Sequence, residues 1–183
     1  MGGILTSSGW IYWEIISTRI GTFGTIPLSV HAVPTQLLMV AYTVPLGMSI
    51  AISVKLASTV VVDVDRARRM VAFALPSFVA FLSCVCVAMY AARARIFDLF
   101  TDEIEVLAGC EGIWWKVCWY FFNVGLAGIL MGIAAGLGLQ WITGIVTIVC
   151  IWCFGLPMTL YFGFINNGGL GVVWSCFGLP TSS

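Results

Sequence analysis

The chain has 183 residues, of which 61% are hydrophobic and only 9% are Asp, Glu, Lys or Arg. A soluble domain carries about 25% charged residues, so this composition, with a mean hydropathy of +1.06, leaves too little polar surface for a soluble globule. The wealth of apolar residues excludes disorder. Eight basic and eight acidic side chains provide no electrostatic surface for nucleic acid. The composition therefore predicts an integral membrane protein whose main partner is the lipid bilayer.

Uncharged runs over residues 20–54, 70–92 and 117–183 locate the membrane helices. A span needs about 20 apolar residues, and turn sequences at 136–140 and 166–169 divide the last run. We predict helices over about 5–18, 29–55, 69–90, 114–136 and 141–165, and a short one from 170. The first and last of these predicted helices are apolar enough to span the membrane, but they are too short to do so. The chain is thus expected to be an all-α bundle of five to six transmembrane helices, a single lobe over residues 1–183 that is incomplete at both ends.

The connections between these helices carry the charges. Residues 97–112 are predicted to be a polar connection with a short helix. Alternate connections lie on the same side of the membrane, and the two sides hold equal numbers of basic residues: Arg19, Arg93, Arg95 and Lys116 against Lys55, Arg66, Arg68 and Arg69. The positive-inside rule therefore does not decide the orientation. The density of the second set slightly favours a cytoplasmic loop from Lys55 to Arg69.

Enzyme chemistry has no residues to support it. The sequence contains no nucleophile–base pair, no phosphate-binding loop and no paired carboxylates. Cys150 and Cys153 have the C-x-x-C spacing, but they lie in an apolar helix, and the chain has a single His. A buried Cys commonly behaves as a small hydrophobic residue. We expect no enzyme activity, no disulfide, no metal site and no cofactor.

Glu14 is the only acid inside an apolar stretch, within the segment WIYWEII at 10–16. A carboxylate at membrane depth is costly and by default marks a functional site. The alternative is an interfacial position with Arg19 as a snorkelling partner. Trp10, Tyr12 and Trp13 offer aromatic faces for a cation, or equally pack as a membrane belt.

The predicted helix over 29–55 holds His31, Pro34, Gln36 and Pro45. Each proline removes a backbone hydrogen bond, and broken helices are typical of transporter cavities. We therefore predict helix breaks at the two prolines. Gln36 is expected to face protein or a cavity. His31 either lines the same cavity or acts as an interfacial hydrogen-bond donor.

The predicted helix over 114–136 carries Gly128, Gly132 and Gly136 at four-residue spacing. Small residues at this spacing let membrane helices approach closely, so we interpret them as packing residues. Asn123, on the same helix, is a candidate cavity residue.

Several segments of the sequence resemble a known protein family. The stretch over 10–57 resembles the start of the C-terminal lobe of eukaryotic multidrug and toxin extrusion (MATE) transporters. Its part VPLGMSIAISVK at 44–55 is similar to the family's V-P-x-G-x-S-x-A-x-S-x-[RK] signature. Similar elements follow in the family's order: IFDLFTDE at 96–103, the glycine run at 128–140, GLP at 155–157 and GLGVVW at 169–174.

The resemblance implies a twelve-helix transporter of which this chain supplies one lobe. It implies export of organic cations or other xenobiotics in exchange for protons or sodium, and a cytoplasmic loop between the second and third helices. Glu14 matches the second carboxylate of the family's E-W-W-x-Y-E motif. Other family acids are replaced here, by Gly9, Gln36 and Val124.

The sequence thus predicts a MATE-type secondary transporter working by alternating access, with Glu14 as the proton-coupling group. The alternative is a transport-inactive fragment or half-lobe that only packs with a partner lobe or a second copy of itself.

Overall fold

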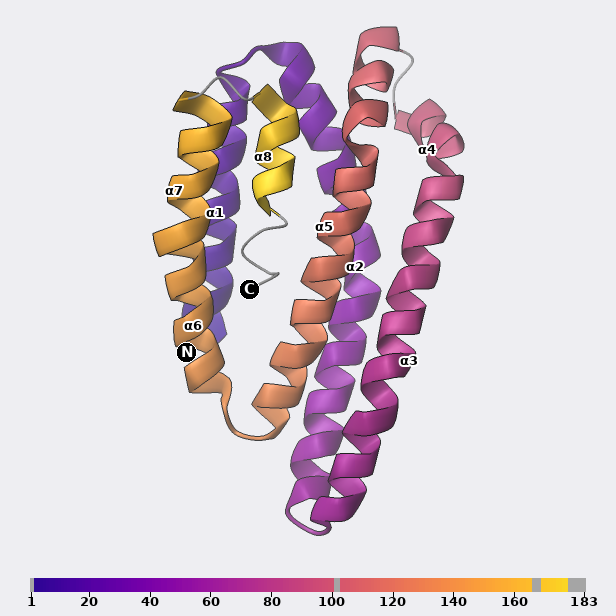
Figure 1. Cartoon of the computed structure of the whole chain (residues 1–183), viewed down its shortest axis with the longest axis vertical. Helices are drawn as coiled ribbons and strands as arrows, with labels where there is room; N and C mark the ends of the chain where they lie inside the picture. The colour runs from indigo at the N-terminus through magenta and orange to yellow at the C-terminus, as the bar shows by residue number, and fades with distance from the viewer. Residues whose placement is uncertain (1, 101–102, 166–168, 178–183) are drawn as a thin grey trace.

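The computed structural model describes residues 2–100, 103–165 and 169–177, and this part of the chain is a bundle of helices without strands. Figure 1 shows most of them running along the long axis of the molecule. In chain order the elements are α1 (Gly2–Gly21), α2 (Thr25–Val60), α3 (Val64–Ala91), α4 (Arg93–Phe100), α5 (Ile104–Gly136), α6 (Gln140–Val149), η1 (Cys150–Gly155), α7 (Leu156–Met158), η2 (Thr159–Ile165) and α8 (Gly169–Phe177).

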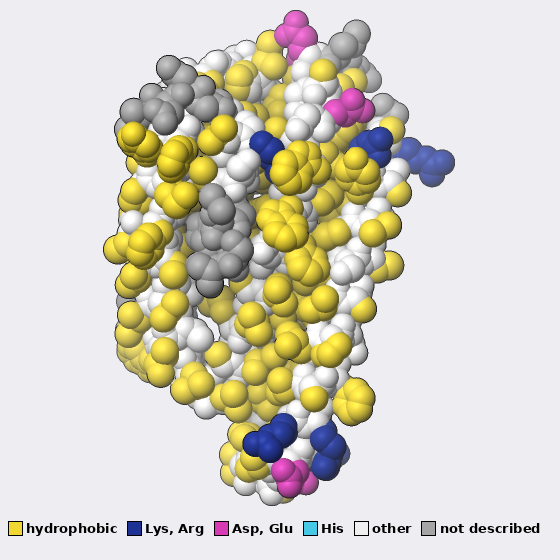
Figure 2. Space-filling model, viewed as in Figure 1, with side chains coloured by type: hydrophobic (Ala, Val, Ile, Leu, Met, Phe, Trp, Pro, Cys, Tyr) yellow, Lys and Arg dark blue, Asp and Glu magenta, His cyan; other side chains and the backbone are white. Residues whose placement is uncertain are grey.

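The six predicted helices are confirmed, and most are longer than predicted. Four helices have the length and apolar composition needed to cross a membrane: Thr25–Val60, Val64–Ala91, Glu105–Gly136 and Gln140–Phe164. Charged side chains gather toward the two ends of the long axis, and the face between them is largely hydrophobic (Figure 2). The chain is therefore a multi-pass integral membrane protein.

The connection predicted over 97–112, polar with a short helix, contains more helix than predicted. The structure places α4 and the first two turns of α5 in this segment, so it is helical over most of its described residues. Phe97 and Val106 are buried, and the Phe97 ring lies edge-on to Trp114 with centroids 4.7 Å apart. Burial of this apolar set against α3 and α5 keeps the segment folded onto the bundle.

The contact between α2 and α5 is the most extensive helix pairing in the described chain. A Cβ atom built on Gly132 would lie 2.6 Å from the Ser49 carbonyl oxygen, and one on Gly136 would lie 2.8 Å from the Ser53 carbonyl oxygen. Ser49 Oγ also donates a hydrogen bond of 2.6 Å to the Gly128 carbonyl oxygen. These glycines therefore let two long helices touch through their backbones.

Helix α2 continues through both Pro34 and Pro45, so the helix breaks predicted at these residues are wrong. A proline inside a helix removes the hydrogen bond to the carbonyl four residues earlier. For Pro34 that carbonyl belongs to Val30, and the Cys110 thiol of α5 donates to it at 3.9 Å. Packing against α5 thus compensates part of the loss and keeps the helix continuous.

Helix α1 is joined to the segment running from α6 to η2. Trp152 Nε1 donates to Ser8 Oγ at 2.6 Å, and the Phe23 and Phe164 rings stack with centroids 5.0 Å apart. Between them, the Tyr12 hydroxyl and Thr159 Oγ1 are 3.2 Å apart. The bundle therefore has two helix groups, α1 with α6–η2, and α2 with α3 and α5, which lie on opposite sides of Figure 1.

The glycine contacts give a direct test of the α2–α5 packing. Gly132→Ala is expected to destabilise the protein by about 1–3 kcal/mol, because the added methyl group overpacks a backbone contact. Gly47→Ala, on the same pair of helices, meets nothing within 4 Å and is expected to be neutral or slightly stabilising. Thermal unfolding in detergent measures both variants, and equal melting temperatures for the two would contradict the packing described here.

Candidate functional site

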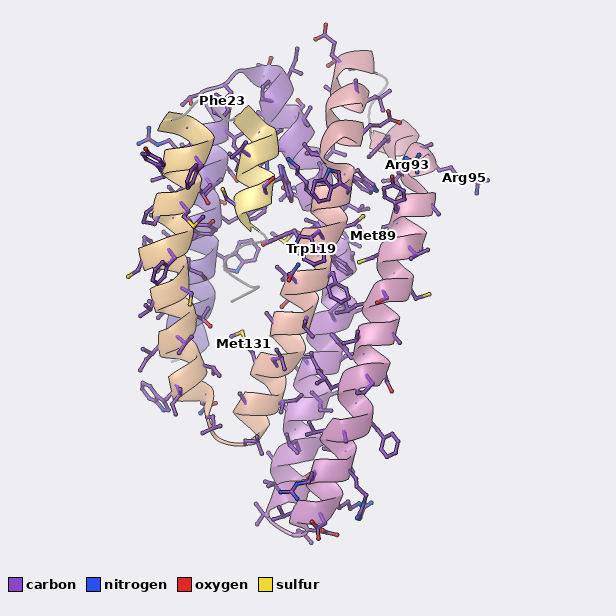
Figure 3. All side chains as sticks on the ribbon, in the orientation of Figure 1. Phe23, Met89, Arg93, Arg95, Trp119 and Met131 are labelled. Carbon is purple, nitrogen blue, oxygen red and sulfur yellow. The ribbon has the colours of Figure 1, made fainter. Side chains whose placement is uncertain are left out.

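A pocket of about 430 Å³ lies between the two helix groups. Its walls are largely apolar and aromatic. The lining residues are Gly9, Trp10, Tyr12 and Trp13 of α1; Thr35, Leu38, Met39 and Tyr42 of α2; Tyr120, Phe121, Val124, Ala127, Gly128 and Met131 of α5; and Thr147, Ile151 and Gly155 from α6 and η1. In Figure 3, Met131 extends from α5 toward α6, across the space that separates the two groups.

A second, shallower depression of about 390 Å³ lies along α1 and contains Glu14. It is lined by Trp10, Ile11, Glu14, Ile15, Thr18 and Arg19. Trp10 is the residue common to both sites. Glu14 therefore borders the shallower depression and does not line the central pocket.

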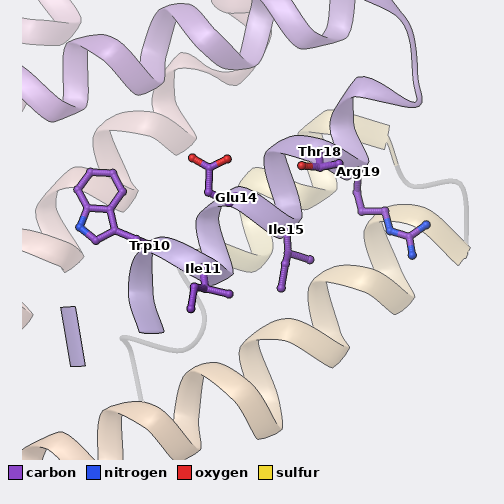
Figure 4. Close-up of a pocket in the computed structure, with 6 residues that line it drawn as sticks. All are labelled: Trp10, Ile11, Glu14, Ile15, Thr18 and Arg19. Carbon is purple, nitrogen blue, oxygen red and sulfur yellow. The ribbon is translucent and has the colours of Figure 1, made fainter. Parts of the chain in front are cut away.

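The Glu14 side chain is exposed on the surface of the bundle. Figure 4 shows its carboxylate with the Arg19 guanidinium extending away from it, farther along α1. No ion pair joins Glu14 to Arg19 in the described part of the chain. The snorkelling partnership weighed as the alternative for Glu14 is therefore not formed here.

His31 lies outside the pocket lining, in an aromatic cluster formed by Trp13, His31, Tyr120 and Trp174. The His31 and Trp174 rings are 5.5 Å apart, and Trp13 and Tyr120 stack at 5.9 Å. Ser17 Oγ and His31 Nε2 are 3.2 Å apart, while the buried Nδ1 of His31 has no hydrogen-bond partner. Because Trp13 and Tyr120 also line the pocket, this cluster closes one end of it.

The remaining predicted cavity residues lie elsewhere. Gln36 is exposed on α2 and does not line the pocket. Asn123 is buried, but its Nδ2 donates to the Trp119 carbonyl oxygen of its own helix at 2.8 Å. Neither amide is brought to the central pocket.

The pocket contains residues that the sequence did not single out, notably Met39, Tyr42, Tyr120 and Met131. They recur at three- and four-residue spacing on α2 and α5, which is the spacing of one helix face. Both helices are apolar all round, so no amphipathic pattern marks which face turns inward. Trp174 was missed for the same reason, although it is among the most buried side chains of the described chain.

Comparison with known proteins places this bundle among transporters. An uncharacterized transporter of Schizosaccharomyces pombe is 26% identical over 180 residues, covering 94% of this chain and 33% of that protein. Multidrug and toxin extrusion protein 1 of Homo sapiens is 26% identical over 170 residues, covering 91% of this chain and 29% of that protein.

The protein DETOXIFICATION 41 of Arabidopsis thaliana is 28% identical over 130 residues, covering 70% of this chain and 26% of that protein. The chain is a relative of the MATE transporters. It spans about a third or less of the length of these curated relatives. No protein-family model and no solved structure matches it. Its similarity to transporters therefore rests on these relatives.

The aromatic cluster of this MATE relative is expected to hold α8 against the bundle. Trp174→Ala removes a side chain that is only 1% exposed, and such truncations cost about 3–5 kcal/mol. Trp141→Ala removes a tryptophan that is 53% exposed and is expected to change stability little. Denaturant unfolding followed by near-ultraviolet circular dichroism compares the two. A Trp174 variant as stable as the Trp141 variant would show that α8 is not anchored by this cluster.

Proposed function

We propose that this chain is one lobe of a MATE-type secondary transporter that exports organic cations in exchange for protons or sodium by alternating access. The observation that carries the proposal is Glu14, a carboxylate on the exposed face of α1 that has no ion-pair partner among the described residues. The family resemblance supports it, since Glu14 matches a family carboxylate.

The position of Glu14 along the bundle supports a place within the membrane. Tyr12, two residues before it, contacts Thr159, which belongs to the candidate span Gln140–Phe164. A lone carboxylate at this level is costly in lipid unless it faces water, binds a cation or carries a proton. A carboxylate that can bind either a proton or another cation is suited to exchanging one for the other.

The open depression around Glu14 requires a second surface to become an enclosed cavity. We propose that this surface is a partner lobe, either another part of a longer protein or a second copy of this chain. The chain covers about a third or less of the relatives, and the rest of their length is enough to supply such a partner.

In the proposed cycle, Glu14 takes up a proton, or binds sodium, when the cavity opens to the outside. It releases that ion when the cavity opens to the inside, and the carboxylate then binds the organic cation. Trp10 borders Glu14 and presents an aromatic face to the same cation. Exposure of this carboxylate to each side in turn couples entry of the proton or sodium to export of the organic cation, because both compete for its single negative charge.

Glu14→Gln tests this role. The amide cannot carry the exchanged charge, so efflux of a cationic dye driven by a pH or sodium gradient should fall by about tenfold or more in proteoliposomes. The control is Glu105→Gln, an exposed acid in the first turn of α5, which should transport like the unmodified chain. Unchanged efflux in the Glu14 variant would exclude it as the coupling group. Absence of efflux from the unmodified chain, with or without a partner lobe, would support the transport-inactive half-lobe instead.

The orientation of the loop from Lys55 to Arg69 is tested separately. Ser58→Cys, at the α2–α3 end, should react with a membrane-impermeant maleimide only from the cytoplasmic side, because basic loops are retained there. Thr22→Cys, in the α1–α2 connection at the other end, should react only from the opposite side. The unmodified chain gives the background from its own cysteines. The reverse labelling pattern would refute the proposed topology.

A further inference from the structure

We propose that the free end of the α2–α3 hairpin binds the headgroups of anionic phospholipids. The contact is made by four basic side chains, those of Lys55, Arg66, Arg68 and Arg69. This binding depends on the hairpin alone. Only the choice of the cytoplasmic leaflet, which is rich in anionic lipids, rests on the proposed topology.

The hairpin extends beyond the other helices at its end of the bundle (Figure 1). A Cβ atom on Gly136, the last residue of α5, would lie 3.0 Å from the Leu56 Cβ atom, so the α5–α6 connection is level with Leu56. Two candidate spans meet at this connection, which places the edge of the hydrocarbon core near it. From Leu56 to Val61 the chain rises about 7 Å, at about 1.5 Å per residue. One headgroup layer is about 5–7 Å thick, so the end of the hairpin lies among the headgroups.

Exposed valines at the turn favour this location over bulk water. Val61 and Val62 are 84% and 86% exposed. The turn itself is well formed, because the backbone amides of Val62 and Asp63 donate to the Thr59 carbonyl oxygen at 3.1 and 2.9 Å. Turns that face bulk water are usually built from polar residues and glycine. Contact with lipid removes this apolar surface from water, which is favourable.

The hairpin has an excess of positive charge. It carries four basic and two acidic side chains, whereas the rest of the chain carries four basic and six acidic ones. Figure 2 shows charged side chains gathered at this end of the molecule. The four basic side chains of the hairpin are exposed, and none of them forms an ion pair within the described part of the chain. Their charged groups can therefore bind phosphate, which guanidinium groups contact in bidentate geometry.

The two acids of the hairpin differ in their effect on such a site. Asp63 Oδ1 accepts a hydrogen bond of 2.9 Å from the Arg66 backbone amide and so caps α3. Asp65 is exposed and precedes Arg69 by four residues, which places the two side chains next to each other on the helix surface. Asp65 is therefore expected to weaken binding of an anion.

One face of α3 can bind both parts of a lipid molecule. Arg66, Arg69 and Phe73 follow one another at three- and four-residue spacing, which is the spacing of one helix face. Phe73 is 75% exposed, so this face turns away from the bundle. A lipid whose phosphate binds the two arginines can lay an acyl chain along the Phe73 ring. A free phosphate ion lacks this second contact.

Native mass spectrometry of the full chain in detergent tests the proposal with two lipids of equal chain length, dioleoyl phosphatidylserine and dioleoyl phosphatidylcholine. Each basic side chain near the membrane surface strengthens attraction to anionic lipid about fivefold, so phosphatidylserine should bind about tenfold or more tightly. Arg66→Gln together with Arg69→Gln should abolish this preference. Arg19→Gln together with Arg95→Gln is the matched control, because it removes the same charge from exposed positions outside the hairpin.

Further variants separate charge from folding. Arg66→Lys together with Arg69→Lys retains the charge and should retain the preference for phosphatidylserine. Asp65→Asn removes a repulsive charge and should strengthen phosphatidylserine binding by about twofold or more. Inorganic phosphate at the concentration of the lipid should not displace phosphatidylserine, since it cannot contact the apolar face.

Equal binding of the two lipids by the unmodified chain would overturn the proposal, as would an equal loss of preference in the hairpin pair and in the matched control. Displacement by inorganic phosphate would overturn the assignment to a lipid. The readout does not involve transport. Absence of the lipid preference with Glu14-dependent efflux intact rejects this inference alone, whereas a clear preference with Glu14-independent efflux rejects the proposed coupling role alone.

Discussion

Backbone polar groups at membrane depth have no water to bind, and this constraint governs the bundle from end to end. It explains why the described spans are continuous helices and why hydroxyl side chains bond to carbonyl oxygens. The same constraint explains the contacts between α2 and α5. The Cys110 thiol reaches the carbonyl that Pro34 leaves without a partner, and Ser49 bonds to the Gly128 carbonyl. Helix pairing thus supplies partners that a single helix lacks.

The pairing of α2 with α5 also divides the bundle into the two helix groups described above. α5 packs tightly on α2 at its glycine end, while α1 contacts α2 and is also bonded to the segment from α6 to η2. The side chains of these two groups do not fill the space between them, and the unfilled space is the central pocket. The segment that faces it contains two π-helical stretches around α7, and such stretches are frequent at functional sites. The pocket is thus a product of helix grouping rather than of any one helix.

Much of the fold could be predicted because lipid solubility imposes long apolar runs that are visible in the sequence. Uncharged stretches, turn glycines and the four-residue spacing of Gly128, Gly132 and Gly136 reflect local requirements. At 97–112 a short helix was predicted, but its full extent was not, because it depends on the burial of Phe97 and Val106 against neighbouring helices. Both prolines of α2 were misjudged, and for Pro34 part of the compensation comes from Cys110 of another helix, which no local pattern reveals.

The sequence by itself determined that this protein lies in a membrane, that its helices fall where they do, and that Glu14 is an isolated acid among apolar residues. It also carried the resemblance to MATE transporters through the order of several short motifs. Only the tertiary structure decided which faces turn inward. Glu14 lies on the outside of the bundle, His31 is enclosed by aromatic rings, and Gln36 and Asn123 are away from the pocket. The physical reason is that helices apolar on every side carry no signal of orientation. Their rotation is decided by the close fit of small residues and by hydrogen bonds between helices.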